Sequence, residues 1–127
     1  MDKIVIAFDV DGTLRCNAEE RHRDKVEPNP RIIALWETLS TFKNVELHIW
    51  SNRGADYCKA IAKQFKLKKC KGYHQKTFRA EQSVEVRALS GGGTYMSIRA
   101  DAFVPDIAID DQQRFDGGNL NLIVREK

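Results

Sequence analysis

Short runs of apolar residues occur along the chain and predict buried strands. The first run, residues 4–8, has five apolar residues in a row and predicts a strand that is buried on both faces. Residues 45–50 predict a second strand, because apolar and more polar side chains alternate there. Further short strands are predicted at residues 72–74, 105–111 and 121–124.

Two segments between these runs have the periodicity of amphipathic helices. Asn29 followed by Pro30 is a helix-start signal, and apolar residues then recur at i, i+3, i+4 and i+7. Those residues are Ile32, Leu35, Trp36 and Leu39. The second helix, residues 55–65, has an inner face formed by Cys58, Ile61, Ala62 and Phe65. Strand, helix, strand and helix in that order predict an α/β fold with a parallel sheet and right-handed crossovers.

Two polar segments do not follow either pattern. Residues 15–27 are rich in charge and predict a loop or flap over the end of the first strand. Its basic residues either touch a substrate or are merely exposed.

Residues 77–98 allow two predictions. Either residues 77–89 form a helix that stops at the three glycines 91–93, or residues 84–89 and 94–98 form a hairpin around these glycines. The alternation of side chains slightly favours the hairpin.

The composition is that of one folded domain. The chain has 127 residues, enough for a single domain over residues 1–127 with one core. Its 42% hydrophobic and 31% charged residues are typical of a globular protein rather than a disordered one. No apolar stretch is long enough to cross a bilayer and no signal-peptide pattern precedes the first strand, so we expect a cytoplasmic protein with no membrane partner. The three cysteines lack a paired spacing, which favours free thiols in a reducing compartment.

The net charge of +3 is unevenly distributed. Between Asp56 and Glu81 the chain has eight basic residues and no acid. They are Lys59, Lys63, Lys66, Lys68, Lys69, Lys71, Lys76 and Arg79. This block could bind a polyanion, although the solvated outer face of the helix at 55–65 is the commoner explanation for the spacing of its first members.

Carboxylates follow the first strand directly. Asp9 and Asp11 are two positions apart, and Gly12 allows a sharp turn just beyond them. While the chain stays extended, we expect both side chains to lean to the same side. Two like charges held close together need a shared proton or a divalent cation such as Mg²⁺. An ordinary Asp-Gly turn is the alternative, and the second carboxylate and Thr13 disfavour it.

Polar residues also follow the second strand. Ser51 and Asn52 come between this strand and a helix N-terminus, where free backbone N–H groups attract an anion. The same residue types cap helices without any further function, so both interpretations stay open. In an open α/β sheet, this turn and the two aspartates lie at the same carboxyl edge.

A second pair of acids, Asp110 and Asp111, ends the strand predicted at 105–111. Because adjacent side chains diverge at the end of a strand, we expect at most one of them to join the first pair directly. The other would orient a water molecule or a neighbouring group.

Residues 9–14 resemble, at every position, the first motif of the haloacid dehalogenase-like (HAD) superfamily of phosphatases, which is Asp-x-Asp-Gly-Thr-Leu. The resemblance implies that Asp9 is the nucleophile that takes the phosphoryl group and that Asp11 is the general acid/base. Residues 47–51 resemble the second motif of the family, which implies that Ser51 donates a hydrogen bond to the phosphoryl group.

The other two motifs of the family supply metal ligation and a basic residue. Residues 107–111 resemble the metal-binding motif, which implies that Asp110 is a direct Mg²⁺ ligand and that Asp111 supports it. The basic residue neutralises charge between nucleophile and phosphate. Our first choice is Arg99, just before the last acidic strand, followed by Lys76 and then Lys71.

Taken together, the resemblance implies a small HAD-type phosphatase. The implied fold is a Rossmann-like three-layer sandwich with a mainly parallel sheet, a minimal cap and an open site. The implied activity is Mg²⁺-dependent hydrolysis of a phosphomonoester through an aspartyl-phosphate intermediate. The implied metal ligands are Asp9, Asp11 through its backbone carbonyl, Asp110 and Asp111, and the implied phosphate-binding residues are Ser51, Asn52 and Arg99.

An open site suits bulky phosphorylated ends, so the expected partner is a phosphorylated small molecule or macromolecule, nucleic acid included. One alternative is a polynucleotide-end phosphatase or a nucleic-acid-binding protein that uses the basic block 59–79. Another is a non-catalytic binding module with the HAD fold. The clustered carboxylates oppose the last alternative, because a scaffold alone gains nothing from like charges held together.

Overall fold

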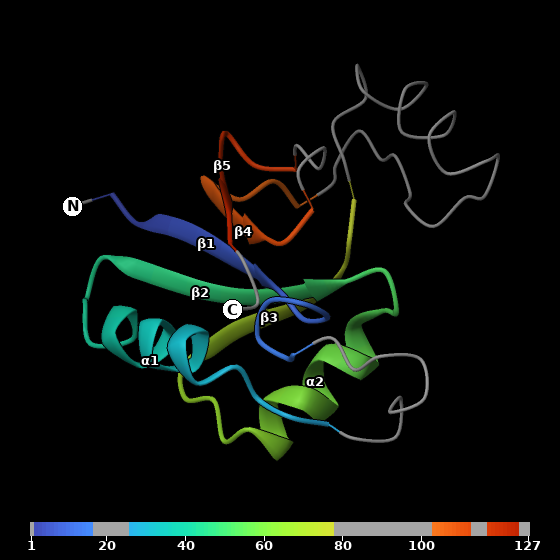
Figure 1. The fold of residues 1–127 in the computed structure, drawn as a ribbon. Helices are drawn as coiled ribbons and strands as arrows, with labels where there is room; N and C mark the ends of the chain where they lie inside the picture. Colours follow the sequence, from blue (N-terminus) through green and yellow to red (C-terminus); the bar gives the residue numbers. More distant parts are fainter. Residues whose placement is uncertain (1, 17–25, 78–102, 113–116, 125–127) are drawn as a thin grey trace, which may run out of the picture.

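Five parallel strands form one sheet in the described part of the chain (Figure 1). The computed structural model describes residues 2–16, 26–77, 103–112 and 117–124. The strands are β1 (Ile4–Asp9), β2 (Val45–Ser51), β3 (Cys70–Gln75), β4 (Ile107–Asp110) and β5 (Leu120–Ile123), and the helices are α1 (Pro30–Leu39) and α2 (Ala55–Gln64). Across the sheet the strand order is β3-β2-β1-β4-β5, and every neighbouring pair is parallel. The protein therefore has the predicted α/β, Rossmann-like fold.

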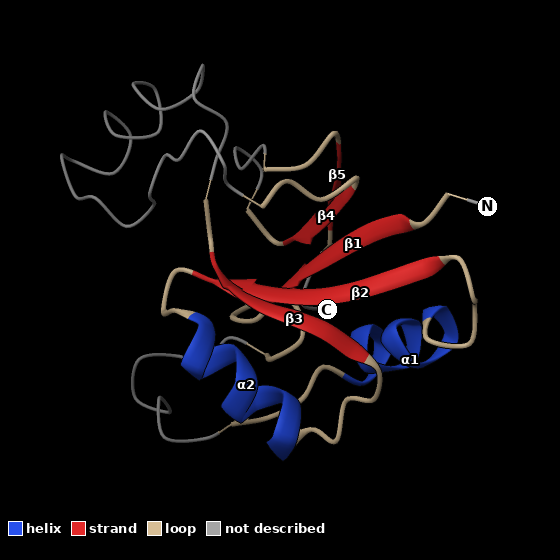
Figure 2. Cartoon of the chain, turned by 180° about the vertical axis from the view of Figure 1, so that it is seen from behind, coloured by secondary structure: helices blue, strands red, loops and turns tan. Residues whose placement is uncertain are grey.

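Both described helices cover the same face of the sheet (Figure 2). In α1, Ile32 and Trp36 are buried, and the Trp36 ring meets the Phe8 ring of β1 edge-on with centroids 5.1 Å apart. The indole N–H of Trp36 donates a hydrogen bond of 2.9 Å to the carbonyl of Lys68, which ties α1 to the chain entering β3. The buried residues of α2 are Cys58, Ile61 and Ala62, as its periodicity predicts.

One predicted core position of α1 faces solvent. Leu35 is 36% exposed. Trp36 is the centre of the buried stripe, and neighbouring positions of a helix point about 100° apart. Leu35 therefore falls at the margin of the stripe, whereas Ile33 and Leu39 pack against the core.

The opposite face of the sheet carries a cluster of aromatic and histidine side chains. The rings of His48, Trp50 and His74 surround Phe103, and the His74 ring stacks on it with centroids 3.9 Å apart. A hydrogen bond of 2.9 Å joins His48 Nδ1 to His74 Nε2. A Cβ at Gly72 would lie 2.9 Å from the His74 ring, so the glycine makes room for this pair. His48 is thus a buried strand residue.

The strand register brings two of the acidic strand ends together. Asp9 pairs with Trp50 of β2, and on the other side Phe8 pairs with Ile109 of β4. The next residue on each strand is an aspartate, so Asp9 and Asp110 lie side by side at the carboxyl edge of the sheet.

The lysine-rich block is spread over different parts of the fold. Exposed members lie on α2 (Lys59 and Lys63) and around the start of β3 (Lys66, Lys68, Lys69 and Lys71). Because β3 is parallel to β1, its start lies at the amino edge of the sheet, opposite Asp9. Lys76, by contrast, is buried just after the end of β3.

Some predicted features lie outside the described residues. They are most of the flap (residues 17–25), the helix predicted at 77–89 apart from Thr77, the alternative hairpin of residues 84–98, the glycines 91–93, Arg79, Arg99 and the minimal cap. Among the helices that the structure describes, none is long and apolar enough to cross a membrane.

Candidate active site

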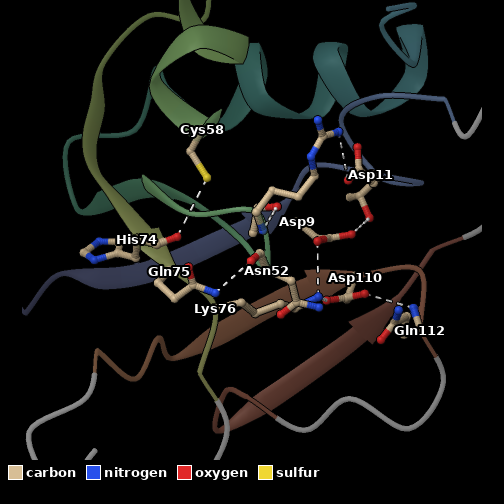
Figure 3. A network of polar contacts seen from close by, with 12 residues as sticks. Asp9, Asp11, Asn52, Cys58, His74, Gln75, Lys76, Asp110 and Gln112 are labelled. Atoms are coloured by element: carbon tan, nitrogen blue, oxygen red, sulfur yellow. Dashed lines mark hydrogen bonds and ion pairs between the residues drawn. The ribbon is translucent and has the colours of Figure 1, made fainter. Parts of the chain in front are cut away.

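A tight turn after β1 separates the two aspartates of the first motif. β1 ends at Asp9, and the N–H of Arg15 donates a hydrogen bond of 2.9 Å back to the carbonyl of Val10. Gly12 has a φ of 85°, a conformation that favours a residue without a Cβ. Asp11 is therefore not part of an extended strand. Contrary to the expectation from the sequence, the two carboxylates do not share one environment, and Figure 3 shows Asp11 on the other side of Asp9 from Asp110.

Asp9 is buried among charged and polar groups. Its Oδ1 lies 3.2 Å from the ammonium Nζ of Lys76, and its Oδ2 accepts a hydrogen bond of 3.2 Å from the Thr13 hydroxyl. Burial raises the pKa of Asp9 well above its usual value, and the nearby carboxyls of Asp110 and Asp111 raise it further, while Lys76 opposes the shift. A cation close to the carboxyl group would therefore favour its ionised form.

Asp110 and Asp111 both join Asp9, so the expectation that only one of them could do so is wrong. Each of the three residues offers a carboxylate oxygen, and these oxygens all lie within 4.8 Å of one another. β4 ends at Asp110, whose Oδ1 accepts a hydrogen bond of 2.9 Å from the N–H of Gln112. This bond closes a turn, so Asp111 no longer follows the alternation of an extended strand. Burial raises the pKa of Asp111.

The basic residue of this cluster is Lys76. Its side chain is 2% exposed and reaches between Asp9 and Asp110 (Figure 3), with Nζ 2.5 Å from Asp110 Oδ2. Burial alone would lower the pKa of Lys76, but the attraction of the two carboxylates raises it above its usual value, so the side chain stays charged. Of our other choices, Lys71 is exposed at the start of β3, and Arg99 lies outside the described residues.

The charges of this cluster do not balance. When ionised, three carboxylates and one ammonium carry a net charge of −2, and Asp9 and Asp110 are buried while Asp111 is partly buried. Oxygen ligands that carry negative charge are the donors that Mg²⁺ prefers, and one divalent cation would neutralise the excess. The residues present therefore fit a magnesium ion held by Asp9, Asp110 and Asp111.

Asp11 has a separate set of partners. Its Oδ1 accepts a hydrogen bond of 2.6 Å from the Tyr57 hydroxyl, and the Nη1 of Arg15 lies 3.6 Å from the same oxygen. On the solvent side, the Nη1 of Arg53 lies 3.9 Å from Asp11 Oδ2. The Asp11 side chain is 39% exposed, so it lies at the entrance to the site and outside the group of Asp9, Asp110 and Asp111.

The turn after β2 holds Ser51 and Asn52 at the same edge. The Ser51 hydroxyl oxygen accepts a hydrogen bond of 3.0 Å from the N–H of Arg53, and the Ser51 carbonyl accepts one of 3.0 Å from the N–H of Lys76. The Gln75 side chain donates a bond of 2.9 Å to the carbonyl of Asn52. These bonds fasten the turn to the end of β3. A hydroxyl that accepts one hydrogen bond can still donate its own hydrogen to an anion.

Three residues have contacts that the sequence analysis did not assign. Arg15 was expected in a flap whose basic residues either touch a substrate or are exposed, but it is buried and donates a hydrogen bond of 2.9 Å to the Tyr57 hydroxyl. Tyr57 lies in the first turn of α2, and this helix follows Ser51, so its place near the edge could have been inferred. Its contact with Asp11 could not have been inferred, because the direction of the turn after β1 determines where the Asp11 side chain lies. The bond from Thr13 to Asp9 is likewise set by that turn.

Comparison of this chain with protein-family models, curated proteins and solved structures finds no match. The function must therefore be argued from the residues of the chain and their geometry.

Proposed function

We propose that the protein is a Mg²⁺-dependent phosphomonoester hydrolase of the HAD type that works through an aspartyl-phosphate intermediate. The observation that carries the proposal is the cluster at the carboxyl edge of the sheet. There a buried aspartate, Asp9, lies against the ammonium of Lys76 and two further carboxylates. The HAD resemblance of residues 9–14 and 107–111 supports the same reading, because it assigns these acids the same roles.

In the first step, a carboxylate oxygen of Asp9 attacks the phosphorus atom, and the bond from phosphorus to the leaving oxygen breaks. The ammonium of Lys76 offsets the repulsion between the anionic nucleophile and the phosphate. Asp11 gives a proton to the leaving oxygen, which departs as an alcohol. Its place at the entrance, outside the buried cluster, suits a group that must reach the leaving side of the substrate.

In the second step, water attacks the phosphorus atom of the aspartyl phosphate. Asp11 takes a proton from this water, and the bond to the Asp9 oxygen breaks to release phosphate and regenerate the free carboxylate. Asp11 thus returns to its protonated form for the next substrate.

Asp9, Asp110 and Asp111 would hold the magnesium ion. When bound, the ion supplies positive charge beside the phosphoryl oxygens and the ionised Asp9. The hydroxyl of Ser51, the side chain of Asn52 and the N–H groups at the start of α2 would bind the remaining phosphoryl oxygens.

The substrate class is a phosphorylated small molecule or macromolecule. The exposed lysines around the start of β3 lie at the amino edge of the sheet, so their placement does not favour a polynucleotide held by them at Asp9. A nucleic-acid-binding protein and a non-catalytic module remain the alternatives, and both predict that Asp9 has no role in turnover.

The test is hydrolysis of 4-nitrophenyl phosphate with and without Mg²⁺ by the wild type, Asp9→Asn and the control Asp2→Asn. Asp2 is an exposed carboxyl outside the cluster. We expect Mg²⁺-dependent turnover that falls by a factor of about 1,000 or more in Asp9→Asn and is unchanged in the control. Turnover that survives Asp9→Asn, or that is absent with every phosphorylated compound tested, would contradict the proposal.

A further inference from the structure

Asp11 is held by a directed chain of hydrogen bonds that begins at a buried arginine. Arg15 Nη1 donates to the Tyr57 hydroxyl at 2.9 Å, and the Tyr57 hydroxyl lies 2.6 Å from Asp11 Oδ1. Arginine has no acceptor, so the tyrosine oxygen accepts from Arg15 and its single hydrogen goes to Asp11.

This chain distinguishes the two oxygens of Asp11. Oδ1 already accepts the hydrogen of Tyr57, so a proton on the carboxyl group is placed on Oδ2. Arg53 Nη1 lies 3.9 Å from Oδ2, which is too far for a hydrogen bond. Oδ2 is thus the oxygen from which a proton can be delivered.

The tyrosine itself is fixed in place. Its ring carries the guanidinium of Arg53, with Cζ 3.9 Å from the ring centroid, and its backbone belongs to the first turn of α2. Arg15 is buried, with a side chain 8% exposed. Tyr57 therefore joins the turn after β1 to the helix after β2.

We propose that Tyr57 is a positioning residue that holds Asp11 Oδ1 and so directs the proton on Oδ2 toward the leaving oxygen of the substrate. The inference rests on the proposed phosphatase function and assigns a role in it to a residue outside the HAD-like motifs quoted above. While the bond from phosphorus to the leaving oxygen breaks, the proton passes from Asp11 Oδ2 to that oxygen, and Tyr57 keeps its own hydrogen. Substrates whose leaving group departs readily as an anion depend little on this transfer.

The experiment compares kcat/KM for phenyl phosphate, which needs the proton, with kcat/KM for 4-nitrophenyl phosphate, which needs it less. The variant is Tyr57→Phe and the matched control is Tyr73→Phe, a tyrosine of β3 outside this chain of bonds. We expect Tyr57→Phe to lower the phenyl phosphate value about tenfold to a hundredfold and the 4-nitrophenyl phosphate value about threefold or less. In an Asp11→Asn background, Tyr57→Phe should not change the ratio further.

An equal loss on both substrates, or a change of the ratio in the Asp11→Asn background, would overturn the positioning role. If the wild type hydrolyses both substrates and Asp9→Asn does not, that result leaves the proposed function in place. If no turnover depends on Asp9, the proposed function fails and the role of Tyr57 fails with it.

A second measurement does not need the Tyr57→Phe variant to fold. Burial raises the pKa of the Tyr57 hydroxyl, and the bond to Asp11 raises it further. We expect Asp11→Asn to lower the pKa of Tyr57. This pKa is measured by NMR titration of the tyrosine ring signals, which are assigned with the variants Tyr73→Phe and Tyr95→Phe. An unchanged pKa would show that the contact is absent and would overturn the inference.

Discussion

Asp9 and Asp11 are separated by one residue, yet the fold places them in opposite surroundings. Asp9 is buried with two other acids and a single ammonium, and its pKa is raised. Asp11 is 39% exposed and lies between two arginines and a tyrosine hydroxyl. The first environment combines three acids with one lysine, whereas the second combines one acid with two arginines. One strand end thus yields two carboxyl groups with different chemistry, which is how a site obtains a nucleophile and a separate proton donor.

Lys76→Met should have the largest effect, because it removes the only cation that the described residues place beside Asp9 and Asp110. Leaving buried charges without a partner costs about 3–5 kcal/mol of the free energy of unfolding. The loss is measured by urea denaturation without metal, with Lys71→Met as control, because Lys71 is an exposed lysine of β3, the strand that Lys76 follows. If both variants lose the same free energy of unfolding, Lys76 does not stabilise the fold through its contacts with Asp9 and Asp110.

A smaller effect separates the two environments directly. Mg²⁺ should raise the Tm of the wild type, since a ligand at a hundred times its Kd adds about 2.7 kcal/mol to the free energy of unfolding. We expect this rise to disappear in Asp111→Asn and to persist in Asp11→Asn, because only Asp111 belongs to the group of three carboxylates. Thermal melts with and without Mg²⁺ check the expectation. If the rise in Tm is lost in Asp11→Asn and kept in Asp111→Asn, the metal binds near Asp11 and not at the group of three carboxylates.

The smallest effect is the pH dependence of the metal-free protein. Asp9 and Asp111 have pKa values above the ordinary 3.8, so the folded state binds protons that the unfolded chain releases. Their contribution to stability is full below about pH 4 and is lost as pH rises through the raised values. His48 and His74 have lowered pKa values and act in the opposite sense, so they lose stability as pH falls below about 6.5.

The informative quantity is therefore the difference between the wild type and Asp111→Asn, which have the same histidines. Without Mg²⁺, we expect Asp111→Asn to gain stability relative to the wild type as pH rises from about 4 to 7, measured by urea denaturation. A difference that stays constant over this range would show that Asp111 does not titrate with a raised pKa.

The sequence predicted the elements of the fold well, because their signals are local. The apolar run before Asp9 predicts β1, and Asn29-Pro30 predicts the start of α1. The order of strands and helices then predicts a parallel sheet whose carboxyl ends meet. That prediction places Asp9 and Asp110 at the same edge of the sheet, and the pairing of β1 with β4 in the structure makes them neighbours.

The turns were the part that the sequence could not predict. The rule of alternating side chains holds only while a strand continues, and it failed at Asp11 and at Asp111, where the chain has already turned. The choice of Lys76 as the basic residue depends on how far β3 extends, which its apolar pattern does not show. The contact between Tyr57 and Asp11 could not be predicted, because it depends on the paths of the loops after β1 and after β2.

The most direct test of the central claim is to identify the residue that carries the phosphoryl group during turnover. Acid-quenched enzyme is reduced with borohydride, which converts an aspartyl phosphate to homoserine, and the peptides are sequenced by mass spectrometry. The account predicts homoserine at position 9, dependent on substrate and Mg²⁺, and none in Asp9→Asn. Homoserine at another aspartate, or turnover of the wild type with no modified residue in quenched samples taken throughout the reaction, would contradict it.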